Sequence, residues 1–162
     1  MSATAQVQLA VMVVKPPPPL DTFQFDKVND GWKLVEDVGP ADDEFQLQLD
    51  TFLRESESCV SGEVMLERAK AMGDLAGQFH AERILRQQAE IPEDWRPFYL
   101  IFPGTGWQDS DGNRQVPYLN WNGDRWYLNW NWLENDFNQN FRLVRLCNYL
   151  YSPAEGGSFP FR

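Results

Sequence analysis

The feature that most constrains the fold of this chain is a concentration of tryptophan near its C-terminal end. Six of the seven tryptophans fall between Trp95 and Trp132, and four of them lie between Trp121 and Trp132. From Arg125 to Trp132, large apolar side chains occupy the even positions and polar or amphipathic side chains the odd positions. Because successive side chains of a β-strand point to opposite faces, this alternation predicts a strand with its indole rings on one face.

Two interpretations of that strand are open. In the first, the even face packs on helices as core, because each buried ring removes about 150–250 Å² of surface from water. Trp126, Leu128 and Trp130 are then expected to be buried. In the second, exposed rings stack on sugars and the neighbouring asparagines bind sugar hydroxyls. If the core interpretation holds for most indoles, the ligand-binding residues expected to stay exposed are Tyr118, Tyr127, Asn129, Asn131 and Trp132.

The tryptophan-rich strand belongs to a predicted antiparallel β module over residues 95–150. Turn signals at Pro103-Gly104, in 109–113 and in 122–124 separate the expected strands. Those strands are 98–102, 115–121, 125–132 and 141–146. Four strands joined by short turns indicate a meander, curved enough to approach a small barrel. The tail over 151–162 shows no periodic pattern and is expected to be loose.

Residues 42–91 are predicted to form an acidic helical region. Apolar residues recur at spacings of three and four from residue 62 onward, and Gly73-Asp74 interrupts them with a helix stop and a new N-cap. Two helices over about 62–72 and 75–89 are therefore expected. Asp42 or Asp43 also caps an expected helix over 42–53, although the apolar positions 45, 47 and 49 fit a strand as well.

Residues 1–40 are predicted to be an arm attached loosely to the rest. The apolar run 7–14 indicates a strand or a disordered segment, and the four prolines 16–19 indicate a polyproline II linker. Asp30-Gly31 lies between the apolar pairs Phe23/Phe25 and Trp32/Leu34, which predicts a short hairpin.

Charge is unevenly distributed along the chain. Residues 1–94 carry a net charge of −10, whereas residues 95–162 carry a net charge of zero. A chain this acidic repels phosphate backbones, so no nucleic-acid partner is expected. Two helices around a glycine turn nevertheless keep a helix-turn-helix regulator as a further alternative.

Cysteine usage and the N-terminal segment predict a cytoplasmic protein. Cys59 and Cys147 show no CxxC spacing, which is typical of free thiols in a reducing compartment. The apolar run 7–14 has no basic residue before it, and prolines stand where a signal peptide would be cleaved. It is also too short to span a bilayer, which takes about 20 residues. Neither a signal peptide nor a membrane span is expected.

No catalytic motif is recognisable in the sequence. Serine-nucleophile, zinc-protease and phosphate-binding glycine patterns are all absent. His80 is the only histidine, and with two cysteines it makes an incomplete zinc set. The run 109–113 has the composition of a calcium loop, but its glycine stands at the fourth rather than the sixth position. No catalytic residue, metal or cofactor is therefore expected, and the protein is predicted not to be an enzyme.

Two stretches, IPEDWRPFYLIFPGTGW and RWYLNWNWLENDF, carry a family resemblance. They resemble a module that recurs in hypothetical proteins of candidate-phyla bacteria. With the segment Glu67-Arg-Ala-Lys70, the resemblance covers residues 67–146, about half of the chain. It implies a bacterial, cytoplasmic protein and conveys no activity or site residues. The chain after Leu146 departs from the expected end of the module.

Together these patterns predict an α+β fold in which a helical pair packs on one face of a curved four-stranded antiparallel meander. The expected function is a non-enzymatic binding or interaction protein, whose partner is a protein, a small molecule or a glycan. The alternative is a carbohydrate-binding module that uses the tryptophan- and asparagine-rich hairpin. The sequence leaves the oligomeric state open.

Overall fold

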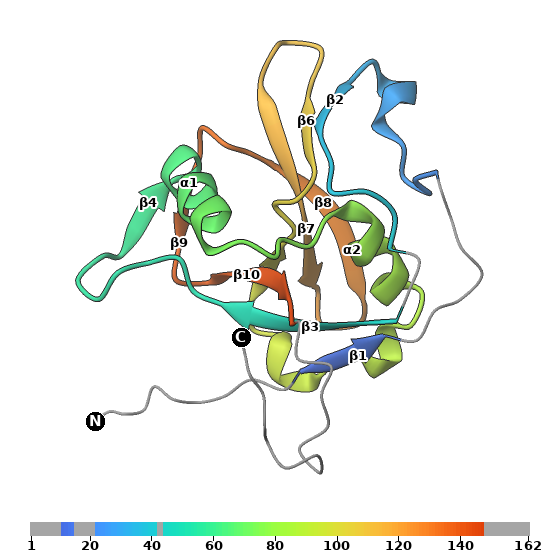
Figure 1. Ribbon diagram of the computed structural model, residues 1–162, viewed down its shortest axis with the longest axis vertical. Coiled ribbons are helices and arrows are strands. Elements are labelled where there is room, and N and C mark those ends of the chain that lie inside the picture. Colours follow the sequence, from blue (N-terminus) through green and yellow to red (C-terminus); the bar gives the residue numbers. More distant parts are fainter. Residues whose placement is uncertain (1–10, 15–21, 42–43, 148–162) are drawn as a thin grey trace.

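The computed structural model describes residues 11–14, 22–41 and 44–147, which form a mixed α+β structure (Figure 1). Its strands are β1 (Met12–Val14), β2 (Lys33–Glu36), β3 (Phe45–Asp50), β4 (Cys59–Ser61), β5 (Tyr99–Ile101), β6 (Gly106–Gln108), β7 (Arg114–Trp121), β8 (Trp126–Trp132), β9 (Asp136–Asn138) and β10 (Phe141–Leu146). The helices are α1 (Gly62–Met72) and α2 (Gln78–Leu85), with 3-10 turns η2 (Lys27–Asp30), η3 (Gln88–Glu90) and η4 (Glu93–Trp95).

Within the described ranges, eight strands form one sheet in the order β1-β3-β10-β5-β7-β6-β2, and β8 pairs with β7 beside this path. β4 and β9 form a separate pair. The four strands expected in the C-terminal half are present as β5, β7, β8 and β10. The expected four-stranded meander is wrong, because β10 crosses over to pair in parallel with β5 and also pairs with β3. Nor do the described strands close into a barrel, since β1, β2 and β8 remain edges.

β7 and β8 form the expected hairpin. Their antiparallel register runs without a shift from Gln115 opposite Trp132 to Trp121 opposite Trp126. Gly123 in the connecting turn has a φ of 98°, a conformation that favours glycine. The hairpin was predictable because its turn and its alternating strands are adjacent in the chain.

Residues 45–50 form a strand, so the expected helix over 42–53 is wrong and the strand alternative is correct. Phe45 and Leu47 are buried while the glutamines between and after them are half-buried, as the period of two requires. β3 lies between β1 and β10 and pairs with both. The local pattern is compatible with a helix or a strand. Pairing with these two strands, which are distant in sequence, makes the segment extended.

The N-terminal segment is part of the sheet rather than a loose arm. β1 pairs with β3, and β2 pairs with β6. The hairpin expected around Asp30-Gly31 is wrong, because residues 27–30 form η2, which Gly31 ends at a φ of 84°. The prolines 16–19 and the tail 151–162 lie outside the described residues.

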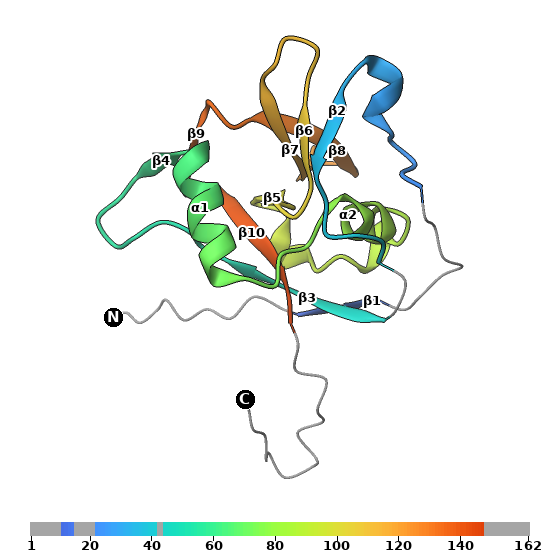
Figure 2. The ribbon, with the colours of Figure 1, turned by 45° about the horizontal axis from the view of Figure 1, so that its top comes forward.

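The two helices lie over opposite faces of the sheet, not as a pair on one face. α2 packs in a cluster with Leu100 and Leu119, whereas α1 packs in a cluster with Ile101 and Val116. Leu100 and Ile101 are neighbours in β5, so their side chains point to opposite sides of the sheet. Figure 2 shows β10 passing between α1 and α2.

The break between the helices is confirmed at Gly73-Asp74, where Asp74 has a φ of 55°. α2 begins later than expected. Leu75 first forms a β-bridge with Arg145, and the Ala76 N–H donates to the Val144 carbonyl at 3.4 Å. The Asp74 carbonyl accepts the Leu146 N–H at 2.7 Å and the Ala76 carbonyl accepts the Gly104 N–H at 2.8 Å, so these carbonyls are not available to extend the helix backwards.

The alternation along β8 is confirmed, and burial decreases along the strand. Trp126 is 1% exposed, Leu128 and Trp130 are half-buried, and Trp132 is 45% exposed. Trp126 is therefore buried as expected, whereas Leu128 and Trp130 are only partly buried.

Candidate functional site

The sheet face opposite α2 brings together tyrosines and asparagines of three neighbouring strands. The register of β7 and β8 places Tyr118 opposite Asn129 and Asn120 opposite Tyr127. The register of β5 and β7, continued by one residue, places Tyr99 beside Asn120. We call these five residues the tyrosine–asparagine face.

α1 covers only part of this side of the sheet. It packs over Ile101 and Val116, which share this side with the tyrosine–asparagine face. Beyond it, Tyr99 and Tyr127 are each 41% exposed, and the other three residues of the face are half-buried. A surface of aromatic rings and amides therefore stays open beside the helix.

The tyrosine rings are held by contacts that reach the core. The Tyr99 ring centroid lies 5.8 Å from that of Tyr118 and 4.9 Å from that of Phe141. Phe141 in turn contacts the buried Phe137 at 4.8 Å. Burial, and after it the neighbouring Tyr99, raise the pKa of Tyr118 above its ordinary value of 10.0. Its hydroxyl therefore stays protonated at neutral pH and can both donate and accept hydrogen bonds.

The two asparagines of the face orient each other. Asn129 Nδ2 donates to Asn120 Oδ1 at 2.6 Å. Asn129 Oδ1 and Asn120 Nδ2 have no hydrogen-bond partner among the described residues. The pair thus keeps one acceptor and one donor without a described partner, and a ligand hydroxyl can both donate and accept a hydrogen bond.

Electrostatics of the face differ from those of the whole chain. None of its five residues is charged, although the chain carries a net charge of −10. At its border the Arg125 guanidinium lies 5.3 Å from the Tyr127 ring centroid. The face therefore suits a neutral, polar ligand better than a strongly charged one.

Three of the five ligand-binding residues expected from the sequence, Tyr118, Tyr127 and Asn129, belong to this face. Asn131 follows on the same side of β8, where its Oδ1 accepts from Asn135 Nδ2 at 2.7 Å. Trp132 does not join them, because its even position in β8 places it on the other side.

Sequence reasoning missed Asn120 and Tyr99. The same alternation applied to β7 would have found Asn120, which lies two residues from Tyr118. Tyr99 had no such signal, because only the pairing of β5 with β7 brings it to the face.

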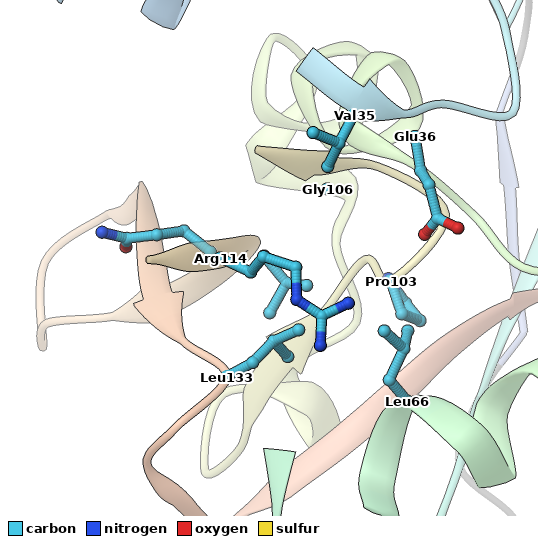
Figure 3. A pocket seen from close by; sticks show the side chains of 9 residues that line it. Val35, Glu36, Leu66, Pro103, Gly106, Arg114 and Leu133 are labelled. Atoms are coloured by element: carbon cyan, nitrogen blue, oxygen red, sulfur yellow. The ribbon is translucent and has the colours of Figure 1, made fainter. Parts of the chain in front are cut away.

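A pocket of 220 Å³ lies on the same side of the sheet, between α1 and β2 (Figure 3). Its wall mixes apolar and polar side chains, and the close-up shows the Arg114 guanidinium between Leu133 and Leu66. Arg114 pairs with Glu63 of α1, and Lys70 of α1 pairs with Glu36 of β2 at 2.8 Å. These groups bond to each other, and the volume is below the roughly 300–1,000 Å³ of typical ligand pockets. The tyrosine–asparagine face is the better candidate.

The polar residues of α2 are turned inward. Gln78, Glu82 and Arg83 are buried. The Glu82 carboxylate accepts the N–H groups of Gln24 at 2.8 Å and Phe25 at 2.9 Å, which ties the N-terminal segment to the helix. A recognition helix needs its polar side chains in solvent to enter a DNA groove, and α2 does not present them.

His80 serves the start of α2. Its Nδ1 accepts the Gly77 N–H at 2.9 Å, and its pKa is lowered to about 4, first by burial and then by Arg83. The imidazole is thus neutral at neutral pH and engaged with the backbone. Among the described residues, no group of three or more histidine, cysteine or acidic side chains lies close enough to hold a metal ion.

No family model, curated protein or solved structure matches this chain. In the described ranges, no helix combines the length and the apolarity needed to cross a membrane.

Proposed function

We propose that this protein is a non-enzymatic binding module whose tyrosine–asparagine face binds a neutral carbohydrate. One observation carries the proposal: two exposed tyrosine rings lie beside a mutually oriented asparagine pair on an uncharged part of the sheet. Sugars present apolar C–H faces that pack on aromatic rings and hydroxyls that exchange hydrogen bonds with amides. Aromatic rings and amides lie on neighbouring strands of this face.

The rigidity of the face supports this proposal. Its residues come from three hydrogen-bonded strands, and its Tyr99 ring is anchored through Phe141. Binding to such a surface immobilises few additional side chains, so little of the interaction energy is lost to ordering.

Competing classes have less support. An acid–base enzyme has less support because the five residues of the face include no carboxylate, histidine or lysine that could exchange a proton with a substrate. A helix-turn-helix regulator needs an accessible recognition helix, whereas the polar residues of α2 are buried.

The experiment is a glycan-panel screen followed by calorimetric titration of the best oligosaccharide. Tyr127→Ala is expected to weaken binding about tenfold, which corresponds to roughly 1.4 kcal/mol, because the sugar loses its stacking ring. Trp132→Ala is the matched control. Trp132 is an equally exposed aromatic residue of the same strand, 45% against 41%, but it lies on the opposite face. We expect this variant to bind like the wild type.

Two further readouts locate the site. Side-chain amide signals of Asn120 and Asn129 should shift on sugar addition, whereas tryptophan fluorescence should change little because the β8 indoles lie on the other side of the sheet. The proposal fails if no glycan of the panel binds saturably, or if Tyr127→Ala and Trp132→Ala lose binding to the same extent.

A further inference from the structure

β8 is an edge of the sheet, paired with β7 along one side and with no described strand along the other. The Leu133 N–H donates to the Arg114 carbonyl, and the Asn122 N–H donates to the Arg125 carbonyl. Odd-numbered positions of this strand therefore bond to β7. Because backbone groups alternate in direction along a strand, the even-numbered residues direct their N–H and C=O groups to the free side.

In the part of the chain that the structure describes, only the two ends of this free edge are bonded. At one end the Trp126 N–H donates to Gln88 Oε1 at 2.9 Å, and at the other the Trp132 carbonyl accepts the Asn135 N–H at 3.1 Å. Between them, no hydrogen bond from the described part of the chain reaches the N–H or C=O groups of Leu128 and Trp130 on this side. Two donors and two acceptors in the middle of the strand thus have no partner among the described residues.

This edge also lacks the features that keep strand edges apart. The seven residues of β8 include no charge and no proline, and their register with β7 has no shift. β2, at the other end of the sheet, carries Lys33 and Glu36 and has a register shift between Leu34 and Glu36. Proteins use such charges and bulges to prevent edge-to-edge pairing, so their absence from β8 indicates an edge that is paired in the working protein.

We propose that β8 pairs in antiparallel orientation with β8 of a second copy of this chain, about a two-fold axis at Asn129. In this register Leu128 lies opposite Trp130 of the second copy, and each such pair exchanges two hydrogen bonds. A register shifted by two residues in either direction would place the occupied N–H of Trp126 or the occupied carbonyl of Trp132 opposite a free group. The bonded ends therefore favour this register. In it, the free N–H and C=O groups of the two copies bond to each other, and no third chain is needed.

Side chains across the proposed interface are compatible. On the side of the tyrosine–asparagine face, Asn129 meets Asn129 of the second copy, and Tyr127 meets Asn131. Uncharged amide and aromatic pairs of this kind stabilise neighbouring strands. The pairing joins the two tyrosine–asparagine faces into one surface, but it does not depend on sugar binding.

The dimer is expected to be weak. A seven-residue edge buries less than the roughly 1,200–2,000 Å² of a standard stable interface, and each copy carries a net charge of −10. We expect a dissociation constant on the order of 10–100 µM. Added salt should strengthen association, because it screens the repulsion between the two acidic copies.

The test is sedimentation velocity on the full chain at about 5–300 µM, at low and at high salt. Asn129→Lys places two like charges opposite each other at the axis. Asn120→Lys is the matched control: it lies on the same side and breaks the same Asn129–Asn120 hydrogen bond. Its two lysines, however, are separated by three strand spacings across the sheet, about 14 Å, and by a similar distance along the strands, so they lie roughly 20 Å apart. Circular dichroism checks that both variants fold.

We expect the wild type and Asn120→Lys to dimerise and Asn129→Lys to dimerise at least about tenfold more weakly. Hydrogen exchange of the Leu128 and Trp130 amides should slow as the protein concentration rises. The proposal is overturned if the wild type stays monomeric over the whole range, if both lysine variants behave alike, or if these two amides exchange independently of concentration. Because self-association is measured without sugar, its outcome is separate from that of the carbohydrate proposal.

Discussion

Replacing tryptophans of β8 with alanine one at a time would measure how burial controls the stability of this fold. Trp126 and Trp132 are the same residue type, in the same strand and on the same side of the sheet, but they are 1% and 45% exposed. Trp130 lies between them and is half-buried. The three variants therefore differ mainly in the depth of the ring that is removed.

The magnitude for Trp126 follows from its environment. A fully buried tryptophan removes about 150–250 Å² from water, which at about 25 cal/mol per Å² corresponds to roughly 4–6 kcal/mol. Its Nε1 is buried without a hydrogen-bond partner among the described residues, which costs about 1–3 kcal/mol in the native protein. Trp126→Ala should therefore destabilise the protein by about 3–4 kcal/mol, within the usual range for such changes. Trp126→Phe removes the unpaired N–H and should cost much less.

Urea unfolding, followed by far-UV circular dichroism, gives the free energies of unfolding. We expect Trp132→Ala to lose less than about 1 kcal/mol and Trp130→Ala to fall between the two, since its ring also contacts Trp32 at 6.1 Å. Equal losses for Trp126→Ala and Trp132→Ala would refute the argument that burial, and not β-propensity of the indole ring, stabilises this strand.

The remaining predictions concern the buried polar groups of α2. The pKa of His80 in the folded protein, about 4, lies below its ordinary value of 6.5. The neutral imidazole therefore contributes about 3 kcal/mol to the free energy of unfolding above pH 6.5, and this contribution is lost as pH falls toward 4. Urea titrations from pH 7 to pH 4 should therefore show a smaller loss for His80→Gln than for the wild type, and identical pH profiles would contradict this. Glu82→Ala leaves the N–H groups of Gln24 and Phe25 without their acceptor, so it should cost about 2–4 kcal/mol, whereas Glu82→Gln should cost less. A loss below about 1 kcal/mol for Glu82→Ala in the same assay would show that water replaces the carboxylate.

Elements stabilised by neighbouring residues were predictable. The β7–β8 hairpin follows from alternation and from the Asn122-Gly123 turn, and α1 follows from its apolar spacing and its Ser61 cap. Elements stabilised by distant partners were not. β3 carries a pattern that suits helix or strand, and only pairing with β1 and β10 makes it extended.

The candidate site divides in the same way. Tyr118, Tyr127 and Asn129 share a face because the hairpin register places them there, and that register is local. Tyr99 lies beside them only because β5 pairs with β7. The exclusion of Trp132, however, follows from its even position in β8 and is therefore local. Charge, by contrast, is a property of composition, and the uncharged character of the face could be read from its residues directly.

The amino-acid sequence by itself determined which side of β8 is apolar, where the hairpin turns and where the first helix stops, because these depend on steric and hydrogen-bonding preferences within a few residues. Tertiary structure alone decided that α1 and α2 cover opposite faces, that β10 runs parallel to β5, and how deeply each tryptophan is buried. Strand order is set by the total burial and backbone pairing of segments far apart in the chain. Many arrangements satisfy the same local pattern, and only the packing of the whole molecule distinguishes among them.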